Sequence, residues 1–373
     1  MRLLLIEPAT KHVQDLGIWP QGDAATLPAP SNGSFYWLSC ERAEFETQLP
    51  RVQTALMQLC GTPLVDLHVS DLLNAQIPST YDYTSEYDVL VFRRLDIPLD
   101  APIKSTLQAV ETDPVGYAVF DALLLSVHPA QCPIQAQSLQ RLLAPSPSPE
   151  KRAIAWRWPP NSADLMLRQV NQMVDGYLNL RRDMGKHIDG WQMQLLNPKS
   201  RFNDWGKVLQ ARLALHQLDE ICEDQRSAIQ DWIDALQTWQ DDHSTKAEHR
   251  ALELLRVRSR DVLEHIERVI HHVHRMEQSA EAAVQMHFSA QSNRANDIMR
   301  TLTTLTAIFL PLNLIAAVFG MNFDVLPLVH KEDGFWWAMG AMGLIGAVLL
   351  VFFWRRRYIE KDSLLGEDST STQ

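Results

Sequence analysis

Glycine and proline are both missing from one long stretch, which runs from Lys207 to Leu310. Because these residues are the usual interruptions of a helix, their absence excludes frequent turns there. The stretch is rich in Leu, Ala, Gln, Glu and Arg, and its apolar residues recur every three or four positions. The polar run at 241–244 is the one place that favours a turn. We therefore expect two long antiparallel helices, and helices of that length need partners, which favours oligomerisation.

Cysteine is scarce, and basic residues are outnumbered. The four cysteines lie far apart and form no paired motif, which excludes a disulfide framework or a zinc knuckle. The 34 Lys and Arg against 45 Asp and Glu give a net charge of -11, which argues against nucleic acid as a partner. No Walker, zincin or Rossmann spacing occurs, so we expect no enzyme. The N-terminal apolar run is too short for a signal peptide, so we expect a first strand and a cytosolic bulk.

Charge is absent from two runs near the C-terminus, residues 301–319 and 335–354. At about 1.5 Å per residue, each run is long enough to cross a hydrocarbon core of roughly 30 Å. Arg300 precedes the first run and arginines 355–357 follow the second, whereas the connecting segment 320–334 is acidic. This asymmetry predicts a two-helix hairpin in the inner (plasma) membrane, with both termini cytosolic.

The first half of the chain reads as a mixed α+β domain. Short apolar runs at 35–38, 88–92 and 119–127 predict strands, and 42–60 and 135–143 predict helices. The fold class is therefore an α+β cytosolic domain, a mixed sheet with flanking helices, followed by a long stalk helix and the membrane hairpin. The expected segments are an N-terminal α/β domain (1–150), a helical cytosolic segment (151–243), a stalk helix that continues into the first span (244–319, the span at about 301–319), an outer loop (320–334), a second span (335–354) and a basic then polar cytosolic tail (355–373).

One face of the first span carries polar side chains, which are costly in a bilayer unless they meet a partner or water. The face repeats at three, four and seven residues and comprises Met299, Thr306, Leu310, Asn313 and Ala317, with Asn296 and Leu302 within one turn of it. Two helices cannot enclose an aqueous path, so a pore requires several copies. Asn313 could instead bond a neighbouring helix or the carbonyl freed by Pro311. The apolar members either pack ordinarily or form rings that close a pore by dewetting.

Gly320, Met321 and Asn322 end this span. An asparagine ring at the outer mouth would offer neutral oxygens to a hydrated cation, which suits Mg²⁺ because this ion sheds its waters reluctantly. A glycine with an asparagine two residues later is also common at the C-terminal end of a helix, as a cap.

These residues resemble the CorA family of divalent-cation channels, whose hallmark is Gly-Met-Asn. The likeness is strong from about residue 260 to 323 and only architectural over the first 200 residues. The wider matching pattern comprises Asn296, Met299, Leu302-Thr303, Ile308-Phe309, Pro311-Leu312, Ile315-Ala316 and Phe323. The resemblance implies a funnel-shaped homopentamer with the first span lining the pore. Mg²⁺ is the expected transported and regulatory ion, with Co²⁺, Ni²⁺ or Zn²⁺ as the alternatives.

The resemblance also implies residue roles. Those in the pore are the selectivity ring at Asn322, a polar ring at Asn313 where the family usually has threonine, a hydrophobic ring at Leu310, a gate at Met299 and Leu302, and an inner polar ring at Asn296. Intracellular magnesium closes the family's pore by bridging carboxylates of neighbouring subunits. Asp261 falls on one such position, with Glu86 or Asp88 as its partner. The alternative for Asp261 is a solvated helix carboxylate beside Arg260.

Two other functions compete with this interpretation. A zinc transporter of the related ZntB type would use the histidines of the stalk, since imidazole suits zinc; they are His265, His271, His272, His274 and His287. A solvated helix face explains the same histidines. A membrane-anchored scaffold or sensor is the other competitor, and the polar residues Asn313 and Asn322 argue against it.

Overall fold

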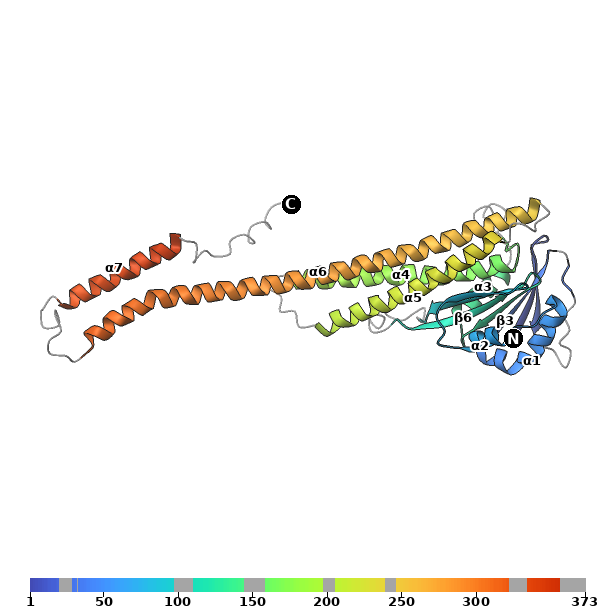
Figure 1. The fold of residues 1–373 in the computed structure, drawn as a ribbon, viewed down its shortest axis with the longest axis horizontal. Helices are drawn as coiled ribbons and strands as arrows, with labels where there is room; N and C mark the ends of the chain where they lie inside the picture. Colours follow the sequence, from blue (N-terminus) through green and yellow to red (C-terminus); the bar gives the residue numbers. More distant parts are fainter. Residues whose placement is uncertain are drawn as a thin grey trace, which may run out of the picture. The chain divides into compact units, whose positions relative to one another are not determined.

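The structure is a computed structural model that describes residues 1–19, 29–31, 33–96, 110–143, 158–196, 205–238, 246–321 and 334–355. The strands are β1 (Arg2–Glu7), β2 (His12–Ile18), β3 (Phe35–Glu41), β4 (Thr80–Tyr83), β5 (Asp88–Leu95), β6 (Thr112–Val119) and β7 (Leu123–His128) (Figure 1). The helices are α1 (Arg42–Cys60), α2 (Asp66–Leu73), α3 (Pro133–Leu143), α4 (Ser162–Leu196), α5 (Trp205–Thr238), α6 (Lys246–Phe319) and α7 (Gly334–Arg355).

The strands form one mixed sheet in the order β2-β1-β3-β7-β6-β5-β4. Only β3 and β7 pair in parallel, and the other neighbours are antiparallel. These two central strands are buried almost throughout, because helices cover both faces of the sheet. That explains why their sequences are continuous apolar runs rather than alternating ones. The predicted mixed sheet with flanking helices is confirmed.

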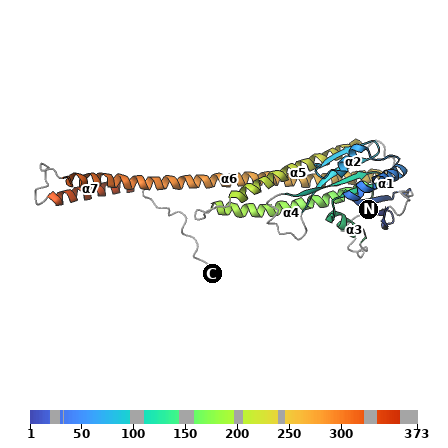
Figure 2. The same cartoon turned by 90° about the horizontal axis from the view of Figure 1, so that it is seen from below.

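The two faces of the sheet carry separate hydrophobic cores. One core contains Phe45 and Leu56 of α1 together with Leu72 of α2. The other contains residues of α3, α4, α5 and α6, including Tyr177 and Trp232. Figures 1 and 2 show α1 and α2 on one side of the sheet and the long helices on the other. The long helices α4, α5 and α6 therefore all lie on one face of the sheet.

The prediction of one strand over 119–127 was wrong. β6 ends at Val119 and β7 begins at Leu123, with a tight turn between them that is closed by a 2.9 Å bond from Phe120 N to Leu123 O. Phe120 is itself buried, at 3% exposed. The apolar pattern therefore continues through the turn, and only Asp121 marks it.

Buried polar contacts tie the long helices together. Trp232 of α5 donates from Nε1 to Ser259 Oγ of α6 at 2.9 Å, and its ring meets Tyr81 of β4 edge to face at 5.8 Å. Asp164 of α4 is 2% exposed and pairs with Arg168 and Arg258, each at 2.7 Å. Because Arg258 lies on α6, this carboxylate joins α4 to α6. The expected long helix is confirmed, and these contacts hold its first half in place.

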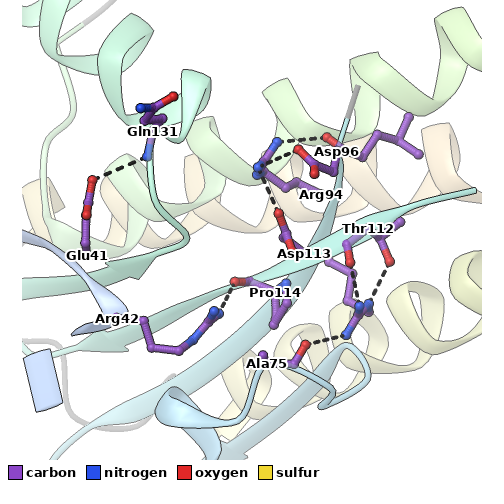
Figure 3. Close-up of polar contacts among 11 residues, drawn as sticks. Glu41, Arg42, Ala75, Arg94, Asp96, Thr112, Asp113, Pro114 and Gln131 are labelled. Atoms are coloured by element: carbon purple, nitrogen blue, oxygen red, sulfur yellow. Dashed lines mark hydrogen bonds and ion pairs between the residues drawn. The ribbon is translucent and has the colours of Figure 1, made fainter. Parts of the chain in front are cut away.

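Figure 3 shows the polar contacts around the end of β5 and the start of β6. Arg94 is buried, and its guanidinium lies 3.1 Å from both Asp96 and Asp113. Arg42, at the start of α1, donates to the carbonyl of Pro114 at 2.8 Å. A buried cation needs such partners, so these contacts are structural.

The chain divides into two compact units, Met1–Ala282 and Ala283–Gln373. The first contains the sheet, α1 to α5 and the first half of α6. The second contains the rest of α6 and α7.

Candidate functional site

The second unit holds two helices long and apolar enough to cross a membrane, the C-terminal part of α6 and α7. Only 6% of the most apolar stretch of α6 is buried, and none of the most apolar stretch of α7 is buried. A core helix of a soluble protein would be mostly buried instead. Such exposed apolar surface requires lipid or further copies of the chain around it.

The two helices pack against each other through one stripe each. The half-buried or buried residues of α6 in this region are Thr304, Ala307, Ile308, Pro311, Leu312 and Ile315. Those of α7 are Ala338, Met342, Ile345, Gly346, Leu349 and Phe353. Both sets recur at three and four residues, so each occupies one face of its helix. Leu312 lies next to Gly346 across the interface, since a β-carbon added to Gly346 would lie 3.9 Å from Leu312 Cδ1.

The seven residues predicted for the pore face are all exposed; six of them lie on the opposite side of α6 from this packed stripe, and Asn296 lies about a quarter turn from it. At about 100° per residue, the centre of the predicted face is roughly half a turn away from the face that meets α7. Its members are Asn296, Met299, Leu302, Thr306, Leu310, Asn313 and Ala317. The residues of α6 that pack on α7 and the residues that carry the polar groups therefore lie on different faces of the helix.

Asn313 differs from the hydroxyl residues around it. Thr306 donates its hydroxyl to the carbonyl of Leu302 at 2.8 Å, and Thr303 does the same to Met299. These bonds satisfy the hydroxyl within its own helix. Asn313 makes no hydrogen bond to any residue that the structure describes, including the carbonyl freed by Pro311. Its amide is free to meet water, an ion or another copy.

Gly320 ends α6. Its N–H donates to Ala316 O at 2.9 Å, and the N–H of Met321 donates to Val318 O at 3.3 Å. Asn322 lies outside the described residues, so its place at a pore mouth stays a prediction.

Asp261 is exposed on α6 and lies one helical turn before His265. Its Oδ1 lies 3.8 Å from His265 Nε2. Asp175 of α4 is close enough to interact with both: burial raises the pKa of Asp175, His265 and Arg141 lower it, and Asp261 raises it. No spacing rule links Asp175 to Asp261, because they lie on different helices. Among the described residues, no group of three or more His, Cys, Asp or Glu side chains could hold a metal ion.

The two suggested partners of Asp261 differ in exposure. Glu86 is exposed in the turn between β4 and β5, where its N–H donates to Thr84 Oγ1 at 3.2 Å. Asp88 is 7% exposed and accepts a short hydrogen bond from the Tyr81 hydroxyl. Burial raises the pKa of Asp88 to about 6, Tyr81 opposes the rise and Asp121 adds to it. Glu86 is therefore the residue accessible to a neighbouring subunit.

The buried Asp88 predicts a pH dependence of stability. Its folded-state pKa lies above the unfolded value, so its ionisation costs stability as the pH rises from about 4 through about 6. Asp88→Asn removes this cost and should stabilise the protein at pH 7.5 by on the order of 2–3 kcal/mol. Thermal unfolding with chelator present measures it. The gain should vanish near pH 4; an equal gain at both pH values would contradict the assignment.

The histidines of the stalk do not converge within the described chain. Arg275 Nη2 donates to His272 Nδ1 at 3.2 Å, and burial, Arg181 and Arg275 lower the pKa of His272. His274 Nε2 lies 3.0 Å from Asp219 Oδ1 of α5. His265 faces Asp261. Each of these three histidines therefore has its own neighbours, as expected of a helix face within a bundle.

Comparison with known proteins supplies the family. The model for the CorA-like Mg²⁺ transporter protein matches residues 32–357. The cobalt/magnesium transport protein CorA of Thermotoga maritima is 29% identical over 100 residues, which cover 27% of this chain and 28% of that protein. The matched segment thus spans less than a third of this relative.

Solved structures share the fold. The complete CorA magnesium transporter of Methanocaldococcus jannaschii has a TM-score of 0.65 at 16% identity, covering 96% of this chain and 99% of that one. The ZntB cytoplasmic domain of Vibrio parahaemolyticus has a TM-score of 0.51 at 14% identity, covering 79% and 98%. Because both types share the fold, the fold alone does not select the ion. The family consists of transporters rather than enzymes, and, on the match over residues 32–357, this chain belongs to the CorA-like Mg²⁺ transporter family.

Proposed function

We propose that the chain is a channel for divalent metal cations, chiefly Mg²⁺, in the inner membrane. The observation that carries the proposal is the exposed polar face of α6, which lies opposite the face packed on α7. A lipid-facing helix would have no use for Asn313, because an amide in hydrocarbon costs free energy unless it is partnered. In an aqueous path the same amide meets water or a hydrated ion.

In this proposal α6 lines the ion path and α7 faces the lipid. α7 carries only apolar or aromatic side chains and glycine from Phe335 to Trp354, which suits a lipid environment. Several copies arranged around an axis would turn the polar face of each α6 inward and each α7 outward. We propose a homopentamer with both termini in the cytosol, as the family resemblance implies.

The identity of the transported ion is inferred from the residue expected at the outer mouth of the path. The amide of Asn322 would hold a cation through its hydration water, and magnesium sheds that water reluctantly. Leu310, Leu302 and Met299 would form apolar constrictions along the same face, and Asn296 a polar ring at the inner end. Co²⁺, Ni²⁺ and Zn²⁺ are the alternative ions.

Regulation is proposed at the exposed carboxylate of Asp261, bridged by Mg²⁺ to Glu86 of a neighbouring subunit. Asp175 would add negative charge beside Asp261. Asp88 is the second partner candidate, although it is enclosed by Tyr81.

The regulatory site makes a prediction for Asp261→Ala. Magnesium should slow proteolysis of the parent protein, and this protection should fall by about tenfold in the variant, the effect of losing about 1.4 kcal/mol of binding. Glu253→Ala, an exposed carboxylate on the same helix, is the control. If protection persists in Asp261→Ala, the regulatory site lies elsewhere.

A flux assay on purified protein in liposomes tests the proposed function. It compares Mg²⁺, Co²⁺, Ni²⁺ and Zn²⁺, with and without a pH gradient. We expect Mg²⁺ entry without a proton requirement. Entry of Zn²⁺ alone would support the ZntB-type alternative, and entry of no ion would support a scaffold or sensor.

A further inference from the structure

One glycine of α7 faces α6, whereas two others face away. A β-carbon on Gly346 would meet Leu312 Cδ1 at 3.9 Å, which is ordinary van der Waals contact. At Gly340 and Gly343 a β-carbon would meet nothing within 4 Å. Gly346 is half-buried and the other two are exposed. The Leu312 side chain thus lies over a position on α7 that has no side chain of its own.

The contact also fixes which residues lie at the same level. α7 folds back along the end of α6 in Figure 1, so the two helices run antiparallel. With equal rise per residue, Leu312 beside Gly346 places Ile308 and Leu349 at nearly the same level, one residue or about 1.5 Å apart along the helix axis. Both of these residues are half-buried, as such a pairing requires. The interface therefore has one register and one rotational setting for each helix.

We propose that the Leu312–Gly346 contact sets the rotation of α6 about its axis, and thereby decides which residues of α6 face the ion path. This inference rests on the proposed function and adds two positioning residues to it. Successive residues are about 100° apart on a helix, so a rotation of α6 by about that angle would bring the apolar Leu314 to the direction in which Asn313 points. Small residues such as glycine at the interface of two membrane helices let the helices approach each other.

The test uses two substitutions of the same size on α7. Gly346→Leu places a large side chain against Leu312, and Gly343→Leu places the same side chain on the open face. Gly346→Ala adds only the β-carbon that the structure accommodates, and it guards against loss of folding in Gly346→Leu. Each variant is combined with Ile308→Cys and Leu349→Cys, whose disulfide yield under mild oxidation reports the rotational setting without any need for ion flux.

We expect the disulfide to form in the parent, Gly346→Ala and Gly343→Leu backgrounds, and to form about tenfold more slowly in Gly346→Leu. Magnesium flux, measured without the cysteines, should fall about tenfold in Gly346→Leu alone. The inference is overturned if the disulfide fails to form in the parent, if Gly346→Leu behaves as Gly343→Leu, or if flux and disulfide yield change independently. A parent that conducts no divalent cation refutes the proposed function instead, and the disulfide yield still decides whether Gly346 fixes the packed face of α6.

Discussion

Asn322→Ala should abolish magnesium entry into liposomes while the assembly stays intact. A hydrogen bond to a charged group contributes about 1.5–3 kcal/mol, and each copy would lose such a bond to the hydrated ion. A loss of this size at the entrance slows passage by tenfold or more, since about 1.4 kcal/mol corresponds to a factor of ten in rate. The signal of a magnesium-sensitive dye gives the rate of magnesium entry, and size-exclusion chromatography checks assembly.

Val325→Ala in the same loop is the matched control for Asn322→Ala. It removes a similar volume and leaves the Gly-Met-Asn residues unchanged. Undiminished flux in Asn322→Ala would mean that the asparagine is only a helix cap and that ions are selected elsewhere.

Asn313→Leu should have a comparably large effect, for a different reason. Asn313 is exposed on the polar face of α6 and has no hydrogen-bond partner among the described residues. Leucine there would extend the apolar ring of Leu310 by one turn and favour dewetting of the path. Removing water from a hydrated ion costs several kcal/mol, so flux should fall by about a hundredfold or more.

Asn313→Thr is the informative companion, because the family resemblance places a threonine at this position. A hydroxyl keeps the ring polar, so flux should stay within about threefold of the parent while the preference among Mg²⁺, Co²⁺ and Ni²⁺ changes. Equal flux in Asn313→Leu and the parent would show that this face of α6 does not line the path.

The long elements could be predicted from the sequence because their patterns are local. The helix over 42–60 has the predicted bounds, although it contains Pro50. The uninterrupted helix through 301–319 follows from the absence of glycine, of charge and of any proline except Pro311. The turn after Val119 escaped prediction because Phe120 is buried within it, so that hydrophobicity did not fall where the chain reversed.

The rest depends on contacts between segments far apart in sequence. Periodicity groups Thr306, Leu310 and Asn313 on one face, yet it does not say which face meets α7; that depends on Leu312 and Gly346. The proximity of Asp175 to Asp261 likewise depends on how α4 packs on α6. Exposure separated Glu86 from Asp88, which the sequence left equivalent.

If the face of α6 opposite α7 lines an ion path, a thiol placed on that face should be reached by a reagent from water. Asn313→Cys and Ile308→Cys are placed separately in the parent, whose own cysteines are buried or half-buried in the first unit. Liposomes are then treated with a membrane-impermeant cationic thiol reagent, and magnesium flux is measured before and after. We expect the reagent to block flux through Asn313→Cys and to leave Ile308→Cys and the parent unchanged. Equal sensitivity of the two variants, or block of Ile308→Cys alone, would mean that this face of α6 does not line the path.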